Sequence, residues 1–207
     1  MENPQKAEVL VLFYSRYGAT VELARHVARG VESITGARAV LRTVPPVAPV
    51  TEKAEPPVPD EGAPYATLDD LVHCDGLILG SPIRFGNMAA PLKAFLDSTS
   101  ALWISGGLAG KPAAVFASGE TPHGGQEATL LSMMLPLLHH GMYLVGVPFT
   151  EKSISSADGG GTPYGASHVS HPSRRGRLSD AERATAQALG RRVASLALAI
   201  VAARRTD

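Results

Sequence analysis

The chain has 207 residues, with 19 basic and 19 acidic side chains and a formal net charge of zero. This length suits one domain with a sizeable core, and we expect that domain to cover residues 1–207. A net charge of zero excludes the basic field of a typical nucleic-acid-binding protein and the acidic field of a protein that docks on basic partners. The single cysteine, Cys74, excludes an intramolecular disulfide framework and a cysteine-rich metal site, as is usual in a reducing cytoplasm.

The sequence carries no pattern typical of export or of membrane insertion. The first 15 residues contain a short apolar run without a basic start or a small-residue cleavage site. The apolar stretch "VASLALAIVAA" (193–203) is shorter than the ~20 residues of a membrane-spanning helix, and arginine pairs flank it. We therefore expect a cytoplasmic protein with no membrane span, in which this stretch is the buried part of a helix.

The first part of the chain alternates between strand and helix patterns. Residues 7–14, "AEVLVLFY", form a continuous apolar run typical of a strand that is buried on both faces. Apolar residues recur at helical spacing over 19–33, with Gly36 beyond them, and a second strand is predicted over 37–44. The proline-rich segment 45–64 is incompatible with a helix or a sheet ladder, so we expect a loop there.

The alternation continues through the middle of the chain. Three further apolar runs predict strands over 76–81, 111–118 and 142–147. Between them we expect a helix that opens at Pro91, and a second helix over 125–141 that is interrupted or bent near Pro136 and closed by Gly141.

A polar, glycine-rich stretch over about 150–178 precedes a long helix that is predicted to end near residue 201, with Ser179 as its N-cap and Glu182 at the capping-box position. Five short apolar strands separated by helices predict a parallel, doubly wound α/β sheet. In such sheets the ligand binds beyond the carboxyl ends of the strands. The residues that follow the first, third and fourth strands are therefore the candidates for a binding site.

The turn after the first strand, "SRYGAT" (15–20), has the composition of a phosphate-binding loop. A helix N-terminus offers unpaired N–H groups and the positive end of the helix dipole. Ser15 and Thr20 add hydroxyl groups, Gly18 allows close approach of the backbone, and no acidic residue repels an anion. The alternative is that Ser15 or Thr20 only caps the helix. The Walker and G-x-G-x-x-G patterns are absent here.

Two more loops are expected at the same edge of the sheet. The loop "SPIRFGN" (81–87) contains Arg84, which could stabilise negative charge, and Phe85, which could pack on a flat ring. The loop "SGETPHGGQE" (118–127) is rich in glycine. Together the three loops suit a ligand with a phosphate tail and a planar polar ring, a description that fits flavin mononucleotide (FMN).

Six segments in order resemble the WrbA-type NAD(P)H:quinone oxidoreductases, a flavodoxin-like family; they read "VLVLFYSRYGAT", "GSPIRFGNM", "FLDSTSALW", "GGQE", "HHGM" and "GGGTPYGA". The resemblance covers nearly the whole chain. It implies a flavodoxin-like five-stranded sheet of order 2-1-3-4-5 with helices on both faces. It also implies bound FMN, a homotetramer built as a dimer of dimers, and two-electron reduction of quinones by NADH or NADPH.

The resemblance further implies roles for individual residues. The FMN phosphate would be held by Ser15, Arg16, Tyr17, Gly18, Ala19 and Thr20. The isoalloxazine ring would be lined by Ile83, Arg84 and Phe85, and the third flavin loop would contribute Ser118, Gly119, Glu120, Thr121 and Gly124. His139 would reach the flavin from a neighbouring subunit, Trp103 would form an aromatic wall for nicotinamide or quinone, and Tyr17 would contact the nicotinamide nucleotide.

Several of these residues also have simpler interpretations. His139 and His140 could only complement a helix C-terminus, and Trp103 could be a core residue. Cys74 is expected to be inert packing. The loop 118–127 is one residue longer than in many members of the family, which leaves the contacts of Glu120 and His123 open.

The predicted function is FMN-dependent reduction of a quinone, with the nicotinamide and the quinone using one pocket in turn, and with neither a metal nor a protein acid required. One alternative is a flavodoxin-type one-electron carrier, which the length of 207 residues and the zero net charge disfavour. Another is a regulatory partner of a DNA-binding protein, but the sequence has no basic face or DNA-binding motif that would contact nucleic acid.

Overall fold

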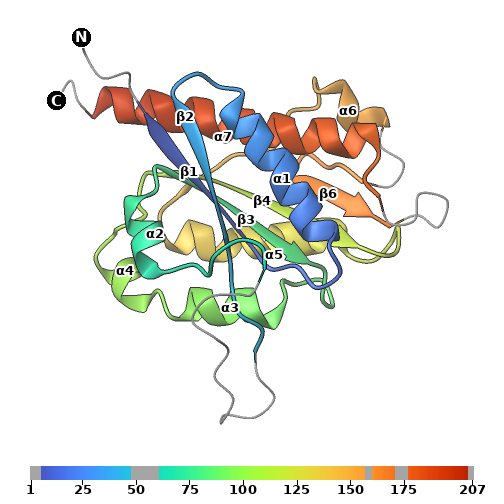
Figure 1. Cartoon of the computed structure of the whole chain (residues 1–207), viewed down its shortest axis with the longest axis horizontal. Helices are drawn as coiled ribbons and strands as arrows, with labels where there is room; N and C mark the ends of the chain where they lie inside the picture. The colour runs from blue at the N-terminus through green and yellow to red at the C-terminus, as the bar shows by residue number, and fades with distance from the viewer. Residues whose placement is uncertain (1–5, 48–60, 157–159, 171–176, 205–207) are drawn as a thin grey trace.

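The computed structural model describes residues 6–47, 61–156, 160–170 and 177–204, so most of the proline-rich segment lies outside it. A parallel sheet lies between two layers of helices (Figure 1). The strands are β1 (Ala7–Phe13), β2 (Ala37–Thr43), β3 (Gly76–Pro82), β4 (Pro112–Gly119), β5 (Tyr143–Leu144) and β6 (Ala166–Val169). The helices are α1 (Ala19–Glu32), α2 (Leu68–His73), α3 (Ala90–Asp97), α4 (Ser100–Ile104), α5 (Gln126–His139), α6 (Lys152–Ser156) and α7 (Asp180–Ala203).

The strand order confirms the predicted doubly wound sheet. The order is β2-β1-β3-β4-β5, with β6 also paired to β4, and every pairing is parallel. Every residue of β3 is buried, as are nearly all residues of β1 and β4. Helices therefore cover both faces of the central strands, which is why their sequences are continuous apolar runs rather than alternating ones.

Two short strands share the fifth position of the sheet, which corrects the strand expected over 142–147. β5 pairs with the first two residues of β4, and β6 pairs with the last four. The chain leaves the sheet between them and forms α6. Residues 166–169 fall in the stretch that was predicted to be a polar loop, because "ASHV" is too short and too polar to resemble a strand, although all four residues are buried.

The other differences concern short or proline-containing helices. The sequence does not predict α2, α4 and α6, because five or six residues show too little periodicity. α5 is not interrupted at Pro136, which lies in its last turn, and Gly141 follows with a φ of 73°. The predicted capping box of Ser179 and Glu182 at the start of α7 is confirmed.

Helices enclose one apolar core on each face of the sheet. Successive residues of β1 point alternately to the two cores, with Val11 in one and Leu12 in the other. α1 and α7 cover the first core (Figure 1). α3 and α5 contribute Leu92 and Met133 to the second.

α1 and α7 approach each other closely at two glycines. A Cβ atom on Gly30 would lie 2.1 Å from the carbonyl oxygen of Gln187, and a Cβ atom on Gly190 would lie 2.1 Å from that of Val27. The absence of a side chain at both positions allows the two backbones to touch. This contact lies in the C-terminal half of α1 and brings that part of the helix directly against α7.

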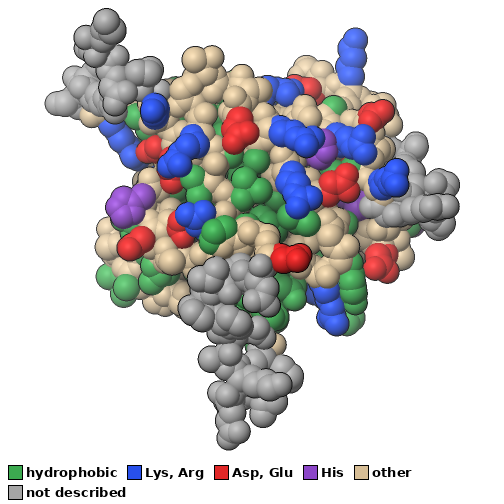
Figure 2. Space-filling view, in the orientation of Figure 1, with side chains coloured by type: hydrophobic (Ala, Val, Ile, Leu, Met, Phe, Trp, Pro, Cys, Tyr) green, Lys and Arg blue, Asp and Glu red, His purple; other side chains and the backbone are tan. Residues whose placement is uncertain are grey.

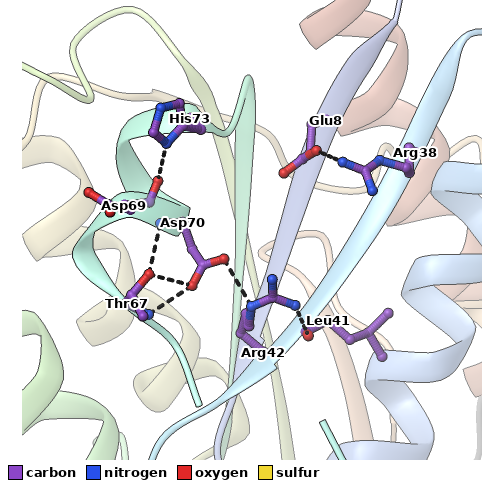
Figure 3. A network of polar contacts seen from close by, with 8 residues as sticks. All are labelled: Glu8, Arg38, Leu41, Arg42, Thr67, Asp69, Asp70 and His73. Carbon is purple, nitrogen blue, oxygen red and sulfur yellow. Dashed lines mark hydrogen bonds and ion pairs between the residues drawn. The ribbon is translucent and has the colours of Figure 1, made fainter. Parts of the chain in front are cut away.

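α2 is attached to the edge of the sheet by the polar network in Figure 3. Thr67 and Asp70 form a capping box at its N-terminus. Asp70 Oδ1 also accepts a hydrogen bond of 2.9 Å from Arg42 Nε of β2. Beside them, the ion pair between Glu8 and Arg38 joins β1 to β2.

α7 is the one described helix that is long and apolar enough to cross a bilayer, by length and composition alone. It has 24 residues and is therefore longer than its apolar C-terminal stretch over residues 193–203, from which the sequence predicts no membrane span. Its inner side packs against α1 and the sheet, and Leu189, Val193 and Ala197 are fully buried. The core helix of a soluble protein meets the same criterion, so the composition of α7 is accounted for by this packing.

We expect Gly190→Ala to lower the free energy of unfolding by roughly 1–3 kcal/mol, because the added methyl group would overlap the backbone of Val27. At an uncrowded helix position the same change would stabilise by up to ~1 kcal/mol, so the sign of the effect is diagnostic. Urea unfolding measures it. Ser195→Ala, at an exposed position of α7, is the control and should stay within about 0.5 kcal/mol of the wild type. A Gly190→Ala protein as stable as this control would contradict the close contact.

Candidate functional site

A cavity of about 1020 Å³ lies at the carboxyl ends of β1, β3, β4 and β6. This is at the upper end of the ~300–1,000 Å³ that ligand pockets commonly have. The three predicted loops line it with Arg16, Tyr17, Gly18, Ala19, Thr20, Ile83, Arg84, Phe85, Ser118, Gly119, Glu120, Thr121 and Gly124. Of the residues predicted to hold FMN, only Ser15 and His139 do not line this cavity.

The turn between β1 and α1 forms the first wall. Gly18 is the N-cap residue of α1 and has a φ of 95°, in the left-handed region that favours glycine. Within the part of the chain that the structure describes, the backbone N–H groups of residues 16–20 donate no hydrogen bond. Free N–H groups at the N-terminus of a 14-residue helix favour a bound anion.

The two hydroxyl residues of this turn have different roles. Ser15 Oγ accepts a hydrogen bond of 3.2 Å from the N–H of Val21, so Ser15 caps the start of α1. Thr20 lines the cavity, and its Oγ1 lies 2.8 Å from Ser118 Oγ at the end of β4. This hydrogen bond joins the first wall to the loop after β4.

The loop after β3 presents Phe85 in a strained conformation. Phe85 has a φ of 51°, the one positive value at a non-glycine residue among those described, and its side chain is fully exposed. Positive φ is costly for a bulky residue, and such strain is concentrated at functional sites. Two backbone hydrogen bonds of 2.9 Å between Arg84 and Asn87 hold the turn. The loop thus holds an aromatic ring beside the cavity, where it can cover a flat ligand.

The loop after β4 packs against the loop after β3. The N–H of Ile83 donates to the carbonyl of Ser118 at 2.9 Å, and a Cβ atom on Gly119 would lie 2.7 Å from Ile83 Cδ1. Glu120 lines the cavity and is exposed, whereas His123 lines a separate pocket. The structure therefore places Glu120, but not His123, where a ligand in the cavity could meet it.

The cavity has further lining residues that the sequence did not identify. They are Val21, Glu22, Arg25, Pro82, Ser170 and Arg177. Arg177 belongs to the cluster "RRGR" (174–177), whose composition resembles an ordinary charged surface. Ser170 follows β6, which was not predicted, and Arg25 follows the turn on α1. The spacing of Arg25 from Gly18, two helical turns along α1, is the one signal that could have revealed it.

Trp103 and His139 lie apart from the cavity. Trp103 Nε1 donates a 2.8 Å hydrogen bond to the carbonyl of His139, and both residues line a groove of about 450 Å³ between α4 and α5. His140 lines the same groove, and its Nε2 lies 2.9 Å from Thr99 Oγ1. Burial, together with the adjacent His139, lowers the pKa of His140. Within one chain, therefore, the structure does not bring Trp103 or His139 to the cavity.

Cys74 is packing, as expected. Its side chain is buried, and its thiol donates a 3.3 Å hydrogen bond to the carbonyl of Leu71. Burial raises the pKa of Cys74 to about 11. Among the described residues, no group of three or more His, Cys, Asp or Glu side chains is placed to bind a metal.

The cavity combines features that match the two ends of FMN. The free N–H groups of residues 16–20 at the start of α1 suit a phosphate, while Ile83, Phe85 and the glycine loop after β4 suit the edge and face of a planar ring. No side chain fills the position of Gly18, and a Cβ atom there would meet nothing within 4 Å. The residues present therefore fit FMN.

Comparisons with known proteins agree with this geometry. The family model described as NADPH-dependent FMN reductase matches residues 9–152. A protein of Syntrophobacter fumaroxidans named NAD(P)H dehydrogenase (quinone) is 44% identical over 197 residues, which cover 92% of this chain and 97% of that protein. A protein of the same name from Geotalea daltonii is 42% identical over 204 residues, covering 95% of this chain and all of that one.

Among solved structures, the chain is similar to that of the flavodoxin, WrbA-like protein from Agrobacterium tumefaciens, with a TM-score of 0.66 and 23% identity. The match covers 93% of this chain and 98% of that one. A flavodoxin from the domain Archaea has a TM-score of 0.61 at 17% identity, and covers 92% of this chain and 98% of that one. These similarities confirm the flavodoxin-like fold.

Gly18→Asp should weaken FMN binding by at least tenfold, because it places a carboxylate where the dianionic phosphate is expected. Titration by quenching of flavin fluorescence measures the dissociation constant. Gly18→Asn separates charge from strain, since asparagine tolerates left-handed backbone and carries no charge, so it should weaken binding much less.

Gly62→Asp is the matched control for this experiment. Gly62 has the same φ of 95°, equally open surroundings and no place in the cavity. It should therefore bear the same backbone strain and leave FMN binding unchanged. Equal FMN affinities of Gly18→Asp and Gly62→Asp would refute the assignment of the phosphate to this turn.

Proposed function

The chain belongs to the NADPH-dependent FMN reductase family, and we propose that it uses FMN to reduce quinones to hydroquinones at the expense of NADH or NADPH. The observation that carries this proposal is the cavity at the strand ends, where free N–H groups meet a strained, exposed aromatic loop. It is supported by relatives that share 42–44% identity over nearly their whole length and are named NAD(P)H dehydrogenase (quinone).

When bound, FMN would supply the redox chemistry by taking a hydride from the nicotinamide and passing two electrons to the quinone. The residues of this chain bind and orient it. The turn 16–20 and the Thr20–Ser118 pair hold the phosphate end. Ile83, Arg84 and Phe85 flank the ring, and Tyr17, which is 76% exposed, is available to a nicotinamide nucleotide.

One cavity serves both substrates in this proposal. The described chain offers a single cavity shared by all three loops, so the nicotinamide must leave before the quinone enters. Arg16 and Arg84 both line it, and Arg16 lies 5.4 Å from the centroid of the Tyr17 ring. Arg84, which is proposed to flank the ring, supplies positive charge that favours the anionic, fully reduced flavin. Glu120 is the acidic residue on the same loops that opposes this effect.

A flavodoxin-type carrier would need a surface that docks on a charged partner. Figure 2 shows basic and acidic side chains interspersed over the face that contains α1 and β2, without a field of one sign. This agrees with the net charge of zero. We therefore propose an enzyme with small-molecule substrates rather than a protein-docking carrier. We also propose that it acts in the cytoplasm.

We also propose a homotetramer in which a neighbouring chain completes the site. α4 and α5 expose a row of apolar side chains around the groove that holds His139; they are Leu131, Leu135, Leu138, Trp103 and Ile104. Leu131, Leu135 and Leu138 follow one another at helical spacing, so one side of α5 is apolar and uncovered. Burial of this side between chains would allow His139 and Trp103 to reach a neighbour's flavin.

Stepwise photoreduction of the FMN-loaded protein should pass from oxidised to fully reduced flavin without a long-wavelength intermediate band, because the positive charge of Arg84 beside the ring favours the two-electron product. Steady-state kinetics with NADH and benzoquinone should give parallel double-reciprocal lines, as expected for two substrates that use one pocket in turn. A strong long-wavelength band together with negligible quinone reduction would instead identify a one-electron carrier.

Leu135→Asp should reduce the size of the assembly and lower quinone reductase activity, because a charge would be buried on the apolar side of α5. Light scattering at micromolar concentration measures the first effect. Val72→Asp introduces the same charge at an exposed apolar position of α2 and should change neither property. A wild-type monomer with full activity would refute the tetramer while leaving the FMN site standing.

A further inference from the structure

The FMN cavity contains more positive charge than its three loops account for. Four arginines line it, against the two carboxylates of Glu22 and Glu120. Arg16 and Arg84 also line a second cavity of about 850 Å³, so these two lie between the cavities. Arg25 and Arg177 line the first cavity alone, and the sequence motifs assign no role to either.

Arg25 lies on the same helix whose N-terminus forms the phosphate turn. Side chains of an α-helix lean toward its N-terminus, so an arginine two turns along α1 extends back toward that turn. Its neighbours Ala24 and His26 are buried while Arg25 is exposed to the cavity. In the described residues its guanidinium has neither an ion pair nor a hydrogen bond.

Arg177 reaches the cavity from the connection between β6 and α7, and one buried carboxylate ties both ends of that connection. Glu182 is fully buried. Its Oε1 accepts a 3.1 Å hydrogen bond from the N–H of Val169, and its Oε2 accepts one of 2.7 Å from the N–H of Ser179. The adjacent Ser170 lines the cavity, and its N–H donates to the carbonyl of Gly119 at 2.9 Å.

Both oxygens of the Glu182 carboxylate accept hydrogen bonds, so the buried group remains stable as an anion. Burial acts to raise its pKa, but the adjacent His168 ring and the hydrogen bonds from the N–H groups of Ser179 and Val169 outweigh burial and leave the pKa of Glu182 below its ordinary value. His168 Nδ1 lies 3.1 Å from Oε1, and both side chains are fully buried. Arg177 therefore lies two residues before a backbone position, Ser179, that Glu182 anchors, and among the described residues its guanidinium has no anionic partner.

Neither acidic residue of the cavity pairs with these two arginines. Glu22 lines the cavity, but its ion-pair partner is Arg183 of α7, with Oε1 3.9 Å from Arg183 Nη2. Glu120 belongs to the loop after β4. Two guanidinium groups without an anionic partner among the described residues, in the same cavity as free backbone N–H groups, favour a doubly charged phosphate monoester.

We propose that Arg25 and Arg177 bind the phosphate group of FMN, and that Glu182 is the positioning residue that holds Arg177 at the cavity. This inference rests on the proposed function and names the residues that give the site its preference for a phosphorylated flavin. Riboflavin has the same ring without the phosphate, so it separates this role from contacts to the ring.

The test is fluorescence-quenching titration of the full chain with FMN and with riboflavin. Arg25→Gln and Arg177→Gln should each raise the dissociation constant of FMN about tenfold and leave that of riboflavin unchanged, because charge-assisted hydrogen bonds are lost only for the phosphate. Raising the salt concentration should weaken FMN binding more in the wild type than in a variant that combines Arg25→Gln with Arg177→Gln. Arg29→Gln, at an exposed arginine of α1 outside the cavity, is the control.

Equal FMN affinities of the two variants and Arg29→Gln would overturn the inference and leave the proposed function intact. A wild-type protein that binds no FMN would overturn both. Glu182→Ala tests the positioning role: it should weaken FMN binding as Arg177→Gln does, and the combination of both changes should weaken it no further. If the two changes weaken FMN binding additively, Glu182 does not act through Arg177 and its positioning role is refuted. If Glu182→Ala does not fold, the FMN and riboflavin affinities of the two arginine variants still test the phosphate site.

Discussion

A parallel sheet that is covered on both faces leaves few places for polar groups. The central strands β1, β3 and β4 are buried almost throughout, so side chains that bind a charged ligand can collect only where these strands end. Parallel pairing brings all those ends to one edge. The helix that follows β1 adds its free N–H groups at the same edge. The contact between α1 and α7 at Gly30 and Gly190 holds the opposite, C-terminal part of that helix.

The sequence predicted those parts of the fold that depend on local, periodic patterns. The central strands, α1, α5 and α7 each have at least seven residues and a clear apolar pattern, and all were identified. The split fifth position was not, because β6 is four residues long and is buried through pairing with β4 rather than through its own hydrophobicity. The place of β6 in the sheet depends on its pairing with β4, which lies far away in the chain, and a single sequence does not display such pairings.

The site shows the same division. Loops that directly follow strands were identified, since their composition and their place in the chain agree. Arg25 and Arg177 were missed, because an arginine on a helix or in a basic run resembles ordinary surface until the fold brings it to the cavity. Trp103 and His139 were predicted to act at the flavin, yet within one chain they share a groove of their own. Their role therefore depends on assembly, which a single chain leaves open as a proposal.

The burial of Cys74 has a consequence for an enzyme that handles quinones. Quinones are electrophiles, and they alkylate proteins chiefly by adding to thiolates. Cys74 is the one sulfhydryl of the chain. Because it is enclosed in the core and its pKa is raised to about 11, it is almost wholly protonated at neutral pH and out of reach of solvent. The one thiol of the chain is thus shielded from alkylation by a quinone substrate.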